Sequence, residues 1–208
     1  MAWQALITGA TNAAMFPSIV QSFWLGEHYN GIIGFMTMFT SATYHVCESL
    51  QRTFLGFNDG RWHHMDNVFA IASLMAVILN FAQFPVDAPE REIMNTSSLC
   101  LAVVAQLMSP WDVFYTIFPL VCAFALLLCI LVYRRRLPRI RRGAGAWAAF
   151  FLIGAVVCFA KGLDERKDWL RMWHGGWHLL VGTFCFFAVR ASHPHGRFDS
   201  RVHADKDV

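Results

Sequence analysis

Apolar residues occur in long runs along the chain, separated by short polar or charged segments. The runs cover residues 5–25, 31–47, 66–84, 96–108, 113–133, 146–160 and 173–189. Most of them approach the roughly 20 apolar residues that a helix needs to cross a bilayer. Apolar positions fill each run and do not mark a single helix face, so a water-soluble core does not account for them. We therefore predict an all-α integral membrane protein, a bundle of seven transmembrane helices.

Two of the runs are less clear than the others. Residues 96–108 are too few to cross a bilayer unless their helix extends back toward Glu92, and the run 146–160 is also short. The polar segment 109–112, which contains Pro110, predicts a tight turn between the fourth and fifth runs. A count of six spans therefore remains an alternative.

Composition agrees with a membrane environment. Hydrophobic residues make up 56% of the 208 residues and charged residues 15%, whereas soluble domains carry about 25% charged residues. The sequence has no Gly-rich phosphate loop, no nucleophile elbow and no basic surface with interleaved aromatic residues. We expect the lipid bilayer and a membrane lipid as partners, and no nucleic acid.

The distribution of arginines predicts the orientation. A block of them lies between the fifth and sixth runs, from Arg134 to Arg142. Basic loops stay in the cytoplasm, so we expect the carboxy terminus to be cytosolic and the amino terminus to lie outside or in the lumen. We divide the chain into a transmembrane domain, 1–190, and a flexible polar cytosolic tail, 191–208. Such a multi-pass protein belongs in the plasma membrane or an endomembrane.

Several polar residues interrupt the apolar runs at helical spacing. Ser41 and His45 are four residues apart, which places them on one helix face one turn apart. His174 and His178 have the same spacing, which lets two imidazoles bind one zinc ion. Asp66 stands at the start of the third run, where a carboxylate is costly unless it pairs or serves a site.

These elements meet at one membrane face if the seven spans alternate in direction. The end of the second run and the starts of the third and seventh then lie on the same side. Each residue also has a simpler explanation. His45 alone can hydrogen-bond another helix, Asp66 can pair with Arg61 or cap its helix, and Ser41 can be an ordinary packing residue.

The combination favours a metal site. Three histidines with an open position are the composition of a catalytic zinc site, although copper, nickel and iron also accept histidine. We expect His28, His63 and His64 to be solvated loop or interface residues. A zinc ion at His45, His174 and His178 would activate a water for attack on an acyl carbonyl. Asp66 is then the candidate base, and Ser41 a donor to the oxyanion or to Asp66.

The motifs, taken in order, resemble the CREST superfamily of membrane hydrolases, which includes alkaline ceramidases and adiponectin-type receptors. They are Ser-x-x-x-His in the second run, Asp in the third and His-x-x-x-His in the seventh. The segments 36–48 and 173–178 are similar to the myomaker and transmembrane-protein-eight branch, although Glu48 stands where that branch usually has Asp. The resemblance implies a seven-helix fold with zinc held by three histidines, and with a serine and an aspartate close by.

Two functions follow from this reasoning. The first is a zinc-dependent intramembrane lipid hydrolase that cleaves an ester or amide bond, ceramidase-like or phospholipase-like. The alternative is a non-enzymatic, myomaker-like membrane-remodelling or fusion protein in which zinc only clamps helices together. A receptor or transporter is disfavoured, because no chain of ionisable residues crosses the predicted bundle. The lipid, the bond cleaved, the organelle and the oligomeric state are not specified by the sequence.

Overall fold

The computed structural model describes residues 2–164 and 167–193 of the chain. Regular structure in these ranges is helical, apart from an isolated bridge between Phe54 and Phe57, which confirms the all-α class. The α-helices are α1 (Ala2–Thr11), α2 (Phe16–Trp24), α3 (His28–Leu50), α4 (Asp59–Leu79), α5 (Pro89–Met108), α6 (Val113–Arg134), α7 (Arg142–Gly162) and α8 (Met172–Ser192).

A helical segment lies at each run predicted from the sequence. The fourth is longer than its run, because α5 begins at Pro89, a residue that fits the first turn of a helix. Within residues 2–164 and 167–193, three segments are long and apolar enough to cross a membrane: Asp59–Ala82, Val113–Arg134 and Arg142–Gly162. A membrane protein is therefore supported, while the count of seven spans and their orientation stay predictions.

The start of the third segment differs from the prediction. Helix α4 begins at Asp59, where the side chain of Asn58 accepts a hydrogen bond from the backbone N–H of Arg61. This cap starts the helix two turns before Asp66. Asp66, at the start of the apolar run, therefore lies within α4 and does not cap the helix.

The first segment is bent where it meets α8. A 3-10 turn, Asn12–Met15, joins α1 to α2. A Cβ atom at Gly182 would lie 2.7 Å from the carbonyl carbon of Ala14, and one at Gly175 would lie 2.8 Å from Ile7. The two glycines are seven residues apart and share one face of α8. They let the first segment pack directly against the helix that carries His174 and His178.

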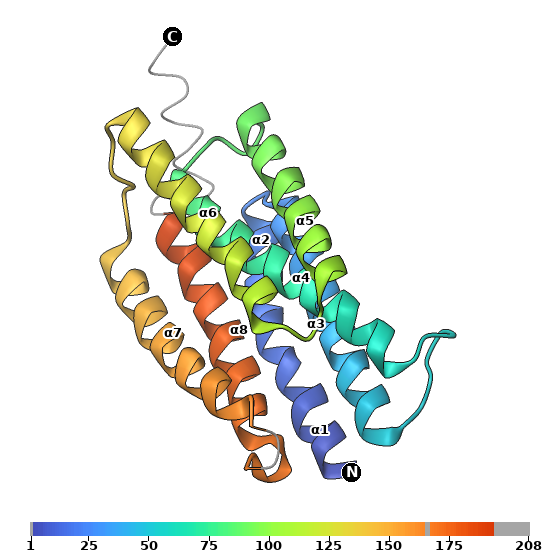
Figure 1. Cartoon of the computed structure of the whole chain (residues 1–208). Coiled ribbons are helices and arrows are strands. Elements are labelled where there is room, and N and C mark those ends of the chain that lie inside the picture. Colours follow the sequence, from blue (N-terminus) through green and yellow to red (C-terminus); the bar gives the residue numbers. More distant parts are fainter. Residues whose placement is uncertain (1, 165–166, 194–208) are drawn as a thin grey trace.

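Helix α8 packs between α7 on one side and the first segment, α1 and α2, on the other (Figure 1). Helix α3 packs against α4, and α6 packs against α4 and α5. The end of α3 and the starts of α4 and α8 lie at the end of the bundle where the amino terminus is found (Figure 1). The predicted candidate residues therefore come from neighbouring helix ends.

The other end of the bundle is held by a buried ionic cluster. Glu27, between α2 and α3, pairs with Arg91 of α5 and accepts a 2.8 Å hydrogen bond from His193, just after α8. Arg91 also donates to Asn80 at 2.9 Å. Burial opposes ionisation of Glu27, but the hydrogen bond from His193 and the charge of Arg91 outweigh it. The pKa of Glu27 therefore lies below the ordinary value of 4.5.

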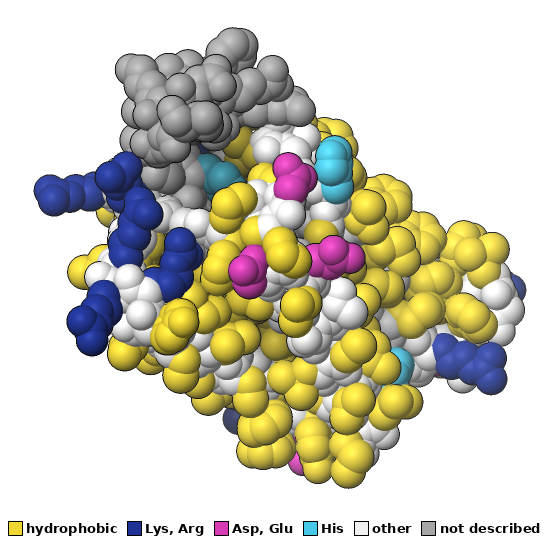
Figure 2. Space-filling view, turned by 90° about the horizontal axis from the view of Figure 1, so that it is seen from above, with side chains coloured by type: hydrophobic (Ala, Val, Ile, Leu, Met, Phe, Trp, Pro, Cys, Tyr) yellow, Lys and Arg dark blue, Asp and Glu magenta, His cyan; other side chains and the backbone are white. Residues whose placement is uncertain are grey.

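The surface at this end is divided between charge and apolar side chains. Figure 2 shows most of the visible Lys and Arg side chains at one edge and a few at the opposite edge, while hydrophobic side chains cover much of the rest. Exposed arginines occupy the end of α6 and the connection to α7, residues 134–142. Ala191 and Ser192 belong to α8, and the predicted tail lies outside the described residues from 194 onward.

Candidate metal centre

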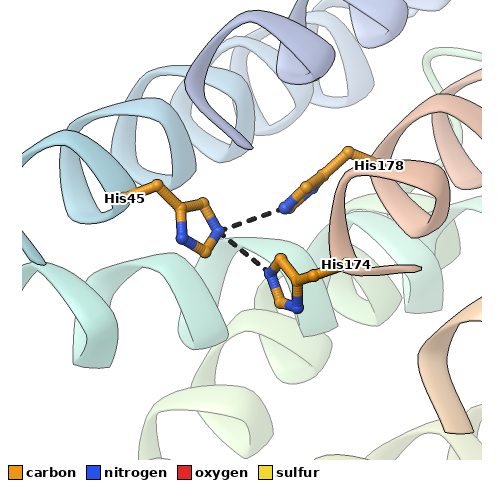
Figure 3. A group of neighbouring side chains, drawn as sticks. All are labelled: His45, His174 and His178. Atoms are coloured by element: carbon orange, nitrogen blue, oxygen red, sulfur yellow. Dashed lines mark hydrogen bonds between the residues drawn. The ribbon is translucent and has the colours of Figure 1, made fainter. Parts of the chain in front are cut away.

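His45, His174 and His178 meet between α3 and α8. The Nε2 atom of His45 lies 3.0 Å from Nε2 of His174 and 3.1 Å from Nε2 of His178. Figure 3 shows the three rings pointing toward one another from the two helices. His45 and His178 are buried and His174 is half-buried. The three residues predicted to hold a metal are therefore neighbours in space.

The side chain of Asp168 caps the start of α8, just before the turn that carries His174. The buried carboxylate of Asp168 accepts hydrogen bonds from the backbone N–H groups of Trp173, at 2.8 Å, and His174, at 2.9 Å. These are N–H groups that a helix start leaves without a partner inside the helix. His178 lies one turn further along, so both imidazoles face α3 from adjacent turns.

The spacing of the nitrogens fits a metal ion. Zn–N bonds of about 2.0–2.1 Å place tetrahedral ligands roughly 3.3 Å apart, close to the 3.0 and 3.1 Å between the Nε2 atoms. Without a metal, both contacts of His45 would have to share the single N–H or the single lone pair that a neutral imidazole offers at Nε2. Within the described ranges, the group contains three histidines and no fourth protein ligand. That composition leaves a position for water or substrate.

His174 and His178 border a cavity of about 320 Å³. Polar groups at the cavity include His174, His178, Ser41 and Asp66. Apolar side chains form much of the remaining wall and come from several helices: Met15, Ile71, Leu74, Leu120, Phe159 and Val181. The cavity thus combines a cluster of polar side chains with an apolar interior.

Ser41 and Asp66, the predicted catalytic pair, face each other across this cavity. Ser41 precedes His45 by one turn of α3, and its buried hydroxyl points toward the carboxyl group of Asp66 on α4. The Ser41 hydroxyl interacts with this carboxyl group, and both side chains border the cavity. Both groups are therefore available to a molecule in the cavity.

One competing histidine is placed differently from the prediction. His63 was expected in a loop or at the interface, but α4 begins before it and carries it into the cavity wall. Its ring stacks on Trp111, with 3.8 Å between ring centroids. No described metal-binding group includes His63. It forms part of the cavity wall beside the histidine cluster.

Three residues near the cluster were not singled out as site residues. Glu48 lies three residues after His45, and its carboxylate accepts hydrogen bonds from Tyr44 and Arg171. The spacing of Tyr44 and Glu48 on α3 was a signal available in the sequence, since residues four apart share a helix face. Arg171 gave no such signal, because it approaches from the segment before α8.

Comparison with known proteins places the chain in a family whose function is not known. No curated protein matches the chain. Residues 1–179, which include all three histidines of the cluster, match DUF3522, described as a protein of unknown function. The match covers well over half of the 208 residues. The chain therefore belongs to the DUF3522 family.

Proposed function

We propose that this protein is a zinc-dependent intramembrane hydrolase that cleaves an ester or amide bond of a membrane lipid. The observation that carries the proposal is the convergence of three imidazole Nε2 atoms at the edge of a cavity that also contains Asp66 and Ser41. Three histidines with an open position suit a catalytic rather than a closed structural zinc site.

A lipid substrate is supported by the walls of the cavity. Its lining is largely apolar and extends from His174 to Cys185, three turns further along α8. The wall includes Leu120 of α6 and Phe159 of α7, and these two helices pack mainly against other partners. An acyl chain entering between α6 and α7 would contact apolar side chains and place its carbonyl group near the histidines.

The chain's own residues can supply the proton transfers. When bound, zinc polarises an acyl carbonyl and makes a water more acidic. Asp66 would accept a proton from the attacking water and return it to the leaving amine or alcohol oxygen. Ser41 would donate its hydroxyl to Asp66 or to the carbonyl oxygen as negative charge develops there. His45, His174 and His178 are the residues that would hold the ion.

The resemblance of the motifs to the CREST superfamily also favours hydrolysis. The serine, the aspartate and the three histidines occupy neighbouring positions in space, as an arrangement of this kind requires. The DUF3522 family itself carries no activity to transfer.

The test is lipid hydrolysis by the purified full-length protein in proteoliposomes. Ceramide and diacyl phospholipid, each with a labelled acyl chain, would be supplied separately, and released fatty acid would be measured. We expect release from one of them, loss of release on zinc chelation and recovery when zinc is added back. Asp66→Asn should remain inactive with zinc present. Release unaffected by chelation and by Asp66→Asn would refute the proposal.

A second function is favoured by the helices that the cluster joins. His45 belongs to α3, whereas His174 and His178 belong to α8, so a metal there would clamp two helices together. A membrane-remodelling protein of this kind would depend on the histidines for folding and not on Asp66. Loss of stability without zinc, combined with no hydrolysis and a neutral Asp66→Asn variant, would favour this function.

A further inference from the structure

His45 has a carboxylate beside its second ring nitrogen. Its Nε2 atom faces the other two imidazoles, while its Nδ1 atom lies 3.6 Å from Oε2 of Glu48, three residues later on α3. This buried Nδ1 makes no hydrogen bond of ordinary length with any described residue. When Nε2 binds a metal, Nδ1 must carry the proton, and Glu48 is the acceptor next to it.

Glu48 is itself held by donors from two elements. Its Oε1 atom accepts hydrogen bonds from the hydroxyl of Tyr44 and from Nη2 of Arg171, each at 2.9 Å. The side chains of Glu48 and Arg171 are 24% and 14% exposed, so water screens this ion pair only in part. Because Oε1 is engaged on this side, Oε2 is the oxygen directed at His45.

The same contact joins the two helices that carry the histidines. Arg171 immediately precedes α8, with a left-handed backbone conformation at φ 59°, and Glu48 lies near the end of α3. The ion pair therefore ties the start of the helix with His174 and His178 to the helix with His45.

We propose that Glu48 is the outer carboxylate that orients His45 as a metal ligand, and that Arg171 and Tyr44 anchor it. The proposal rests on the proposed function in one respect, namely that the three imidazoles bind a metal. A carboxylate that accepts a hydrogen bond from Nδ1–H fixes the tautomer with a free lone pair at Nε2 and makes that nitrogen a stronger ligand. Glu48 is thus a positioning residue, because it acts through His45.

The test measures zinc affinity of the full-length protein in detergent by competition with a chromophoric chelator. Loss of such an outer partner typically weakens metal binding about 10- to 100-fold, and we expect a loss of this size for Glu48→Gln. Glu48→Asp, which keeps the carboxylate, should recover at least part of the affinity. Glu92→Gln is the matched control, because Glu92 is exposed in the first turn of α5, and it should bind zinc as the wild type does.

Variants of Arg171 distinguish two roles of Glu48: orienting His45 as a ligand, and joining α3 to the start of α8 through the ion pair with Arg171. Arg171→Gln keeps Glu48 beside His45, so its loss of affinity should be smaller than that of Glu48→Gln. The double variant Glu48→Gln, Arg171→Gln removes both members of this ion pair, so neither of the two is left without the other, and it should bind zinc as weakly as Glu48→Gln. Thermal unfolding of each metal-free protein checks that the fold is retained.

Wild-type zinc affinity in a folded Glu48→Gln variant, or in the double variant, would overturn the proposal. A wild-type protein that binds zinc but hydrolyses no lipid would refute the proposed function and leave the role of Glu48 intact. A wild-type protein that binds no zinc would refute both.

Discussion

Ser41 shows how one side chain can be tested separately from the metal ligands. It lies one turn before His45 on α3 and is 2% exposed, and its hydroxyl is directed at the carboxyl group of Asp66. A substrate carbonyl in the cavity would offer this hydroxyl an alternative acceptor.

We predict that Ser41→Ala lowers the rate of lipid hydrolysis on the order of 100-fold, the effect of removing one donor to a developing oxyanion. Zinc content should stay at the wild-type level, because Ser41 is not a ligand. Ser73→Ala is the matched control, since Ser73 lines the same cavity on α4, and its rate should not change. Equal rates for Ser41→Ala and wild type, measured in proteoliposomes, would remove Ser41 from the mechanism.

The site was predictable from the sequence where spacing along one helix decides the geometry. Residues four apart, such as His174 and His178, must share a face of α8. Contacts between helices were only partly predictable. His63 was misplaced because the cap at Asn58 starts α4 before the apolar run begins. Arg171 was missed because its contact with Glu48 spans 123 positions in sequence.

At the scale of elements, the approach of the first segment to α8 depends on Gly182. The ideal position of a Cβ atom there is 2.8 Å from the carbonyl oxygen of Ala14 and 2.9 Å from the backbone nitrogen of Met15. Backbone atoms cannot rotate away as a flexible side chain can. The 3-10 turn must therefore move if a methyl group is added.

We predict that Gly182→Ala lowers the free energy of unfolding by about 1–3 kcal/mol, the usual cost of overpacking. Gly143→Ala in α7 is the matched control, because its Cβ atom would meet nothing within 4 Å. Replacing that glycine should not lower the free energy of unfolding, because the added methyl group displaces nothing. Unfolding in detergent would measure both. A neutral Gly182→Ala variant would contradict the direct backbone packing.

The ionic cluster of Glu27, Arg91 and His193 fixes three elements at the opposite end. Breaking such a buried pair costs about 3 kcal/mol, so Glu27→Gln should be less stable than wild type by about this amount at neutral pH. The pKa of Glu27 is depressed on folding. Its stabilising contribution is therefore fully present above pH 4.5 and is lost as pH falls through the folded pKa.

The difference in thermal midpoint between wild type and Glu27→Gln gives the measurement. We expect the difference to shrink as pH falls below 4.5. Other carboxylates titrate in both proteins and cancel. A difference independent of pH down to 3 would show that the charge of Glu27 contributes nothing.

For the whole molecule, the apolar runs predicted the number and order of the helical segments well, because each run is long and clearly bounded. The boundaries were less predictable: Pro89 and Asn58 start helices ahead of the apolar runs through capping and proline geometry. Three segments have the length and hydropathy of membrane spans. Orientation depends on the charged loops alone.

We predict that residues 134–142 face the cytosol and that the loop between α3 and α4 faces the opposite side. Single cysteines at Arg136 and Gln51, both exposed, would be tested with a membrane-impermeant maleimide on intact cells. The Gln51→Cys variant should react and the Arg136→Cys variant should react only after permeabilisation. Labelling of the wild-type chain gives the background signal from its own six cysteines. Reaction of Arg136→Cys on intact cells, with Gln51→Cys reacting only after permeabilisation, would show that the orientation is opposite to the predicted one.

The central claim is that His45, His174 and His178 form one metal site. Elemental analysis of detergent-purified protein tests it most directly, with His45→Ala and the double variant His174→Ala, His178→Ala beside the wild type. We predict about one zinc per wild-type chain, because three imidazoles with an open position compose a catalytic zinc site, and loss of the metal in both variants. Wild-type protein purified without chelator and free of metal would contradict the claim and leave the histidines as a hydrogen-bonded contact between α3 and α8.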